Sequence, residues 1–208
     1  PPCDRRYAKS RGGWHFLRAL RSSAGPRAAL MITATAMQSN LGRSAIPIFV
    51  AILFCLVGCS VQLAPPGASV VPAAIDADAF VMSDGVRLPF RAWMPEQEPK
   101  AVVLALHGMN DSRNAWEYPA PDLAKAGIAV FAPDQRGFGA TESRSLWATT
   151  NGLVSDARDM ARILHARYPG KRLILMGESM GAAVWMVAAT SDAPPPADGY
   201  VLVAPAVW

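Results

Sequence analysis

The stretch "LMGESMGAAV", residues 175–184, holds one serine between two glycines and decides how the fold of this chain is interpreted. The sequence "RLILMGES" that leads into it is a continuous apolar run, as expected for a strand buried on both faces. The sequence "MGAAVWMVAAT" that follows has the composition of a helix. The pattern therefore predicts a sharp strand-to-helix turn at Ser179, in which Gly177 and Gly181 remove side chains that would clash.

Ser179 is a candidate nucleophile, because a serine held in a strained turn of this kind projects its hydroxyl away from the backbone. The amide of Met180 would then lie at the start of a helix, where it can face a developing negative charge. The alternative is a glycine-rich turn that only serves packing. The G-x-S-x-G spacing alone does not separate the two readings, but the strand before it and the helix after it favour the nucleophile.

The sequence around this turn alternates between short apolar runs and helical patterns. Four runs have the character of buried strands: 101–108, 128–134, 172–179 and 199–205. Helices are expected in the second half of 114–127, at 151–170 and at 180–190. This order predicts an α/β fold with a mostly parallel sheet and right-handed crossover helices. Functional residues of such sheets lie at the carboxyl ends of strands, where His107, Asp134 and Ser179 are found.

A hairpin is expected before the parallel strands. The sequence "AFVMSDGVRLPFRAWMP", 79–95, contains two apolar runs around Asp84-Gly85, a dipeptide typical of tight turns. Pro89 interrupts the second run and has no backbone N–H, so this strand is predicted to be an edge strand.

Three segments together carry a resemblance: "HGMNDSRNAW" (107–116), "DQRGFGATES" (134–143) and "GESMGAAV" (177–184). At these separations they resemble the α/β-hydrolase superfamily over residues 80–208. The nearest branch is the monoacylglycerol lipase or lysophospholipase-like one, also described as serine aminopeptidase S33-like. The resemblance implies an α/β-hydrolase fold and a serine hydrolase that acts on carboxylic esters through an acyl-enzyme on Ser179. It also implies an oxyanion hole made by the backbone amides of Met109 and Met180.

A nucleophilic serine of this kind is activated by a histidine and an acidic residue, and their order along the chain restricts which residues can serve. In this fold the acid and the histidine of a triad follow the nucleophile. His107 is therefore interpreted as a residue that structures its loop, and Asp134 as one that holds the glycine-rich turn. His165, Asp156 and Glu178 are interpreted as solvated or structural.

After Ser179 the sequence contains Asp192 and Asp198, neither at the position expected of the acid, and no histidine. The chain is therefore expected to be the N-terminal part of a longer hydrolase, truncated after the strand that follows the nucleophile helix. Two alternatives remain. One is a complete, non-catalytic lipoprotein that uses a partial hydrolase scaffold, and the other is an S33-type peptidase.

The N-terminal part has the character of an export signal. Residues 1–44 hold eight basic residues and one acidic residue, and an apolar run of 14 residues follows at 45–58. The run is short for a membrane-spanning helix, which needs about 20 residues, but it suits a signal peptide. Its end, "LVGCS", resembles the bacterial lipoprotein motif, which implies cleavage before Cys59, lipid attachment to Cys59 and a place in the bacterial cell envelope.

These features divide the chain into three parts. Residues 1–58 are a leader and signal peptide, with Met31 and Met37 as candidate starts. Residues 59–79 are the lipidated cysteine and a Pro/Ala-rich tether, and residues 80–208 are the hydrolase part.

Residues 45–208 hold 12 basic and 15 acidic residues, which excludes a basic nucleic-acid surface there. No cysteine follows Cys59. The sequence suggests no metal and no organic cofactor. The expected partners are a small-molecule ester and, through the lipid anchor, a membrane.

Overall fold

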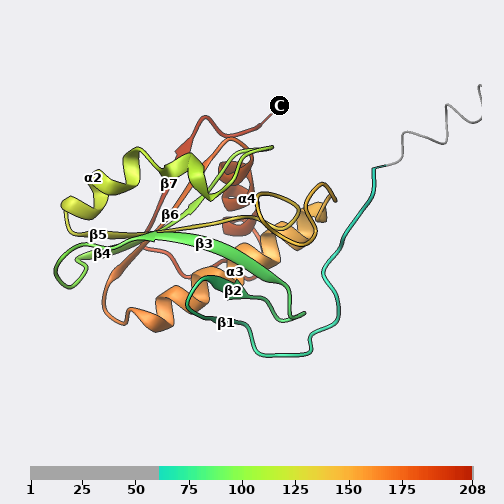
Figure 1. The fold of residues 1–208 in the computed structure, drawn as a ribbon, viewed down its shortest axis with the longest axis horizontal. Coiled ribbons are helices and arrows are strands. Elements are labelled where there is room, and N and C mark those ends of the chain that lie inside the picture. Colours follow the sequence, from blue (N-terminus) through green and yellow to red (C-terminus); the bar gives the residue numbers. More distant parts are fainter. Residues whose placement is uncertain (1–60, 208) are drawn as a thin grey trace, which may run out of the picture. The chain divides into compact units, whose positions relative to one another are not determined.

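The computed structural model describes residues 61–207, and Figure 1 shows their fold. In chain order the elements are β1 (Ala74–Ile75), β2 (Ala79–Val81), β3 (Arg87–Trp93), β4 (Ala101–Leu106), η1 (Arg113–Trp116), α2 (Pro119–Lys125), β5 (Ile128–Pro133), α3 (Thr149–Arg167), β6 (Arg172–Glu178), α4 (Met180–Ala189) and β7 (Gly199–Val203). All four strands and all three helices predicted from the apolar patterns are present.

The strands form one mixed sheet in the order β1-β2-β3-β5-β4-β6-β7. β5, β4, β6 and β7 run parallel to one another, whereas β1, β2 and β3 are joined by antiparallel pairing, and β3 is antiparallel to β5. The predicted mostly parallel sheet with crossover helices is therefore confirmed. Because the parallel strands end at the same edge, residues after β4, β5 and β6 are brought to one side of the molecule.

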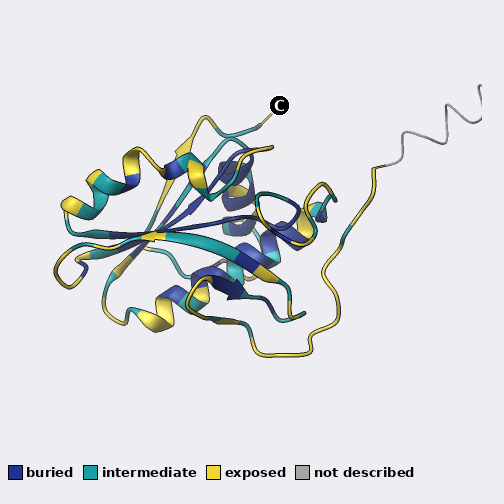
Figure 2. Ribbon diagram, viewed as in Figure 1, coloured by how far each residue is buried: buried dark blue, intermediate teal, exposed yellow. Residues whose placement is uncertain are grey.

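Helices cover both faces of the sheet, so the central strands must be apolar on both sides. In β4, Leu104 packs in the larger core cluster with residues of α3 and α4, while its neighbours Val103 and Ala105 pack in a second cluster with Trp116 and Ala120 of η1 and α2. Figure 2 shows the buried strands between these layers. This arrangement explains why the sequence of β4 has no polar–apolar alternation.

The expected hairpin is present, but the prediction that its second strand is an edge was wrong. β3 pairs with β2 on one side and with β5 on the other. Pro89 lies where β3 passes from one partner to the next: it is opposite Ala79 of β2, and pairing with β5 begins at Phe90. The Phe90 N–H donates to the Asp78 carbonyl at 3.0 Å, whereas the Pro89 carbonyl accepts from the Asp134 N–H at 2.7 Å, so the missing Pro89 donor faces β5 just before that ladder begins.

The segment predicted to be an irregular tether also packs against the domain in its described part. It contributes β1, and the N–H groups of Val70 and Val71 donate to the carbonyl of Ser83 at 2.7 and 3.1 Å. The Ala64 N–H donates to the Trp147 carbonyl at 2.8 Å. The folded part therefore begins before residue 80, because backbone hydrogen bonds, which composition does not reveal, hold a Pro/Ala-rich segment in place.

The predicted leader, signal peptide and lipid attachment site at Cys59 lie outside the described residues. Within residues 61–207, no helix has the length and hydropathy needed to cross a membrane.

Candidate active site

Ser179 lies at the junction of β6 and α4, as the sequence predicted, and its backbone is strained. Its φ of 49° and ψ of −110° are unusual for a residue with a side chain. Three hydrogen bonds hold it there. The Ser179 N–H donates to the Val203 carbonyl at 2.9 Å, and its own carbonyl accepts from the N–H groups of Ala183 at 3.1 Å and Ala206 at 3.0 Å. The surrounding chain thus fixes a turn that an isolated peptide would avoid.

The two glycines of the turn are required by close backbone approach. A Cβ atom on Gly177 would lie 2.5 Å from the Ala182 nitrogen, and one on Gly181 would lie 2.7 Å from the carbonyl carbon of Leu106. Real Cβ atoms do not approach backbone this closely. Strand β6, helix α4 and the end of β4 can therefore meet only if both positions lack a side chain.

The loop after β4 runs directly beside Ser179. A Cβ atom built on Gly108 would lie 3.4 Å from the Ser179 Cβ and 4.0 Å from the Ser179 Oγ. The next residue is Met109, whose amide donates no hydrogen bond to another of the residues at 61–207. Met180 is the first residue of α4, so its N–H has no acceptor within the helix. The structure thus places Gly108, the residue before Met109, near Ser179, and Met180 at the start of the helix that follows the serine.

His107 is buried, and both of its ring nitrogens are occupied. Nε2 accepts a hydrogen bond from the Gln135 N–H at 3.1 Å, and Nδ1 lies 2.7 Å from the Gly108 carbonyl. This pairing requires a neutral ring with its proton on Nδ1. Burial lowers the pKa of His107, which also favours the neutral form. The imidazole therefore joins the loop after β4 to the loop after β5, as the interpretation from sequence held, and has no free nitrogen for Ser179.

Asp134 is also buried and serves the same two loops. Its carboxylate accepts hydrogen bonds from the backbone N–H groups of Arg113 at 2.7 Å and Ala140 at 2.8 Å, and it pairs with the Arg113 guanidinium at 3.3 Å. Gly139 has a φ of 57°, and a Cβ atom there would overlap the Asp134 carboxylate. Asp134 thus holds the glycine-rich turn, as the sequence indicated.

Two further acidic residues near the sheet, Asp156 and Asp198, have structural partners. Asp156 is buried in an ion pair with Arg136, and Asp198 accepts the Leu173 N–H at 2.8 Å, at the opposite end of β6 from Ser179. His165 is exposed on α3. Among residues 61–207, no group of three His, Cys, Asp or Glu side chains is placed to hold a metal ion.

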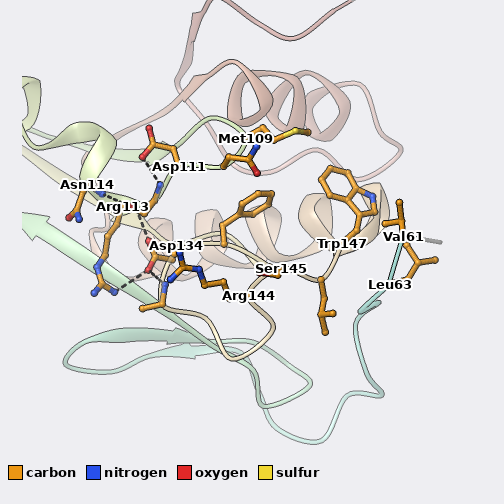
Figure 3. Close-up of a pocket in the computed structure, with 17 residues that line it drawn as sticks. Val61, Leu63, Met109, Asp111, Arg113, Asn114, Asp134, Arg144, Ser145 and Trp147 are labelled. Carbon is orange, nitrogen blue, oxygen red and sulfur yellow. Dashed lines mark hydrogen bonds and ion pairs between the residues drawn. The ribbon is translucent and has the colours of Figure 1, made fainter. Parts of the chain in front are cut away.

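An open pocket of about 1020 Å³ lies between the loops that follow β4 and β5 (Figure 3). Ser179 is not one of its lining residues, but Met109 is, and a Cβ atom on Gly108 before it would lie 3.4 Å from the Ser179 Cβ. The wall opposite the β4 loop is formed by Trp147 together with Val61 and Leu63. Val61 and Leu63 were not predicted from the sequence as pocket residues, because their segment has the composition of a tether.

The fold and the site define a class. A mostly parallel sheet crossed by helices, with a strained serine between a central strand and its helix, is the α/β-hydrolase fold. A search of solved structures agrees: the α/β hydrolase GrgF from Penicillium matches with a TM-score of 0.54 over 61% of this chain and 44% of its own, at 20% identity.

A family model described as serine aminopeptidase, S33, matches residues 97–208, and the chain belongs to that family. Among curated relatives, human monoglyceride lipase is 32% identical over 133 residues, which is 64% of this chain and 44% of the relative. Monoacylglycerol lipase of Mycolicibacterium smegmatis is 28% identical over 51% of this chain and 38% of its own length. The chain thus spans less than half the length of these relatives.

Proposed function

We propose that the complete protein is a serine hydrolase of carboxylic esters, with Ser179 as its nucleophile. The observation that carries the proposal is the strained Ser179, with Gly108 packed against its side chain so that the Met109 amide follows directly. A turn that served only packing would have no need of an L-residue at a φ of 49°, where glycine would cost less.

In the proposed reaction the Ser179 Oγ attacks the ester carbonyl carbon and loses its proton to a general base. The carbonyl oxygen becomes an oxyanion, which the amides of Met109 and Met180 stabilise. The intermediate collapses, the alcohol leaves with the proton from the base, and an acyl-enzyme remains. Water then attacks the acyl carbon, returns its proton through the same base, and releases the carboxylic acid and free Ser179.

The base of such a site follows the nucleophile in this fold class. The three histidines of the sequence are His15, His107 and His165, all before Ser179. Because the chain spans less than half the length of the relatives, the tests below use the complete protein.

The proposed substrates are monoacylglycerols or lysophospholipid-like esters. The support is the naming of relatives as monoglyceride and monoacylglycerol lipases, together with the envelope location proposed below. The family description also names an aminopeptidase activity. The complete protein should hydrolyse p-nitrophenyl esters faster than aminoacyl p-nitroanilides. The reverse preference would favour the peptidase.

The decisive experiment is labelling of the complete protein with a fluorophosphonate, which reacts with activated serines. Wild type should be labelled, Ser179→Ala should not, and Ser191→Ala, two residues after the end of α4, should be labelled like wild type. A folded wild-type protein that remains unlabelled would overturn the enzyme proposal and leave the non-catalytic lipoprotein as the better account.

The location is proposed from the sequence motif at residues 56–59. Cys59 would carry the lipid that holds the protein in a bacterial envelope membrane, since each buried methylene of an acyl chain adds about 0.8 kcal/mol to membrane binding. Intact mass of the membrane-bound protein should show a diacylglycerol adduct that is lost in Cys59→Ser. An unmodified protein in the soluble fraction contradicts the anchor.

A further inference from the structure

The pocket between the β4 and β5 loops has two ends of different chemistry. At one end lie the polar and charged side chains of Asp111, Arg113, Asn114, Asp134 and Arg144 (Figure 3). At the other end Trp147 lies beside Val61 and Leu63, and Met109 lies on the rim between the two ends. A pocket with one apolar and one polar end matches a molecule with an alkyl chain and a polar head.

The apolar wall is held in place by backbone hydrogen bonds. Leu63 forms a parallel bridge with Trp147, the Trp147 N–H donates to the Gln62 carbonyl at 2.8 Å, and the Ala64 N–H donates to the Trp147 carbonyl at 2.8 Å. In an extended segment, residues two apart face the same side, so Val61 and Leu63 point together. Both line the pocket, yet they are 70% and 59% exposed, and Met109 is 53% exposed. Among residues 61–207, three large apolar side chains are thus exposed together at one pocket mouth, as expected of a surface that takes an apolar ligand.

The polar end carries no net charge. Among the lining residues the acidic groups are Asp111 and Asp134, and the basic groups are Arg113 and Arg144. Arg113 already pairs with Asp134 at 3.3 Å, which leaves one carboxylate and one guanidinium for a ligand. This balance suits an uncharged or zwitterionic head and disfavours a strongly anionic one such as coenzyme A.

The position of the wall in the chain indicates where the ligand comes from. Val61 is two residues after Cys59, so the proposed lipid anchor lies no more than about 7 Å along the chain from this wall. Met109 on the pocket rim follows Gly108, on which a Cβ atom would lie 3.4 Å from the Ser179 Cβ. The pocket thus lies beside both the proposed point of membrane attachment in the sequence and the loop next to the proposed nucleophile.

From this arrangement we infer that residues 61–64 form the membrane-side wall of an entry site for a single-chain lipid drawn from the bilayer. The alkyl chain lies against Val61, Leu63 and Trp147, and a head without net charge lies at the Arg113 and Arg144 end. The inference deepens the proposed function and rests on it for the fate of the lipid. Binding at this site is nevertheless measurable without turnover.

The test is photocrosslinking of the complete, anchored protein in phosphatidylethanolamine and phosphatidylglycerol vesicles. The probe is lysophosphatidylethanolamine with a diazirine in its acyl chain, and labelled peptides are identified by mass spectrometry. We expect crosslinks on both pocket walls, in residues 61–64 and 146–147, and a reduced yield when monoacylglycerol, but not acyl-coenzyme A, competes. Labelling of 61–64 alone, or equal labelling by a two-chain phosphatidylethanolamine probe, would mean simple contact with the bilayer and would overturn the inference.

Two variants sharpen the test. Val61→Ser with Leu63→Ser leaves the backbone bonds of the segment intact and should lower crosslinking at residues 146–147 by about fivefold or more, because apolar contact area is lost. The matched control is Val70→Ser with Val71→Ser, two apolar residues of the same segment that do not line the pocket, and it should match wild type. Equal yields from the two double variants overturn the inference. Ser179→Ala should retain the crosslinks, so loss of fluorophosphonate labelling and loss of lipid binding are separable results.

Discussion

The guanidinium of Arg136 and the carboxylate of Asp156 form a buried, two-bond ion pair between the loop after β5 and helix α3. Arg136 Nε donates to Asp156 Oδ2 at 2.7 Å, and Arg136 Nη2 donates to Asp156 Oδ1 at 2.9 Å. The same guanidinium donates to Asp84 of the β2–β3 hairpin at 2.8 Å, and Asp84 accepts the Gly67 N–H at 2.9 Å. One buried arginine therefore connects a helix, a hairpin and the N-terminal segment that forms a pocket wall.

This network should make Asp156 important for stability. Asp156→Asn removes the charge of one of the two carboxylates that bind Arg136, while the buried pair with Asp84 remains, so the free energy of unfolding should fall by about 1.5 kcal/mol. Asp159→Asn, which breaks the partly exposed pair with Arg162 on the same helix, should cost less than about 0.5 kcal/mol. Urea denaturation of both variants measures the difference. Equal costs would show that the buried pair contributes no more than a surface pair.

A methyl group at Gly181 should be poorly tolerated. The Cβ atom of Gly181→Ala would lie 2.7 Å from the Leu106 carbonyl carbon and 2.8 Å from the His107 carbonyl oxygen, both of them backbone atoms. We expect a loss of about 2 kcal/mol or more of unfolding free energy, since strand and helix must move apart. In Gly199→Ala the nearest atom is the flexible Cδ1 of Ile174 at 3.3 Å, so thermal unfolding should change little. Similar melting temperatures for the two variants would contradict this account.

His107 should make stability depend on pH. Its pKa is lowered in the folded state, mainly by burial, from the ordinary value of 6.5, so the unfolded chain binds the proton more readily. The contribution of His107 is therefore complete above pH 6.5 and is lost as pH falls toward its folded pKa. Between pH 7.5 and 5.5, wild type should lose more unfolding free energy than His107→Gln, measured by urea denaturation at each pH. Parallel losses would show that the Nε2 bond to Gln135 does not depend on a neutral ring.

Local patterns were sufficient to predict most of the fold. Each central strand is apolar on both faces, and helix α2 ends at a residue with a clear signal, Gly127, which has a φ of 89°. The place of Pro89 could not be read in the same way. A proline excludes a hydrogen bond only on the side where its N–H would point, and that side depends on which strands become neighbours.

The site was predictable where it depends on one turn and not where it depends on distant contacts. Ser179 and its glycines form a local motif. The pocket wall at Val61 and Leu63 exists because 61–64 pairs with Trp147, more than 80 residues away in the sequence. Composition describes such a segment as a tether, because a few backbone hydrogen bonds leave no periodic pattern.

The strain at Ser179 can be measured by comparing two substitutions that both remove the hydroxyl. Ser179→Ala keeps a Cβ atom at a φ of 49°, whereas Ser179→Gly does not. Relief of this strain should outweigh the extra flexibility that glycine gives the unfolded chain, so the glycine variant should be the more stable by about 1 kcal/mol. At Ser191, whose φ is not positive, the order should reverse, because only the cost of flexibility remains. Denaturant unfolding of the four variants measures these differences in unfolding free energy. If the glycine variant is the less stable at both positions, the turn at Ser179 stores no strain, and its backbone is not evidence for a nucleophile.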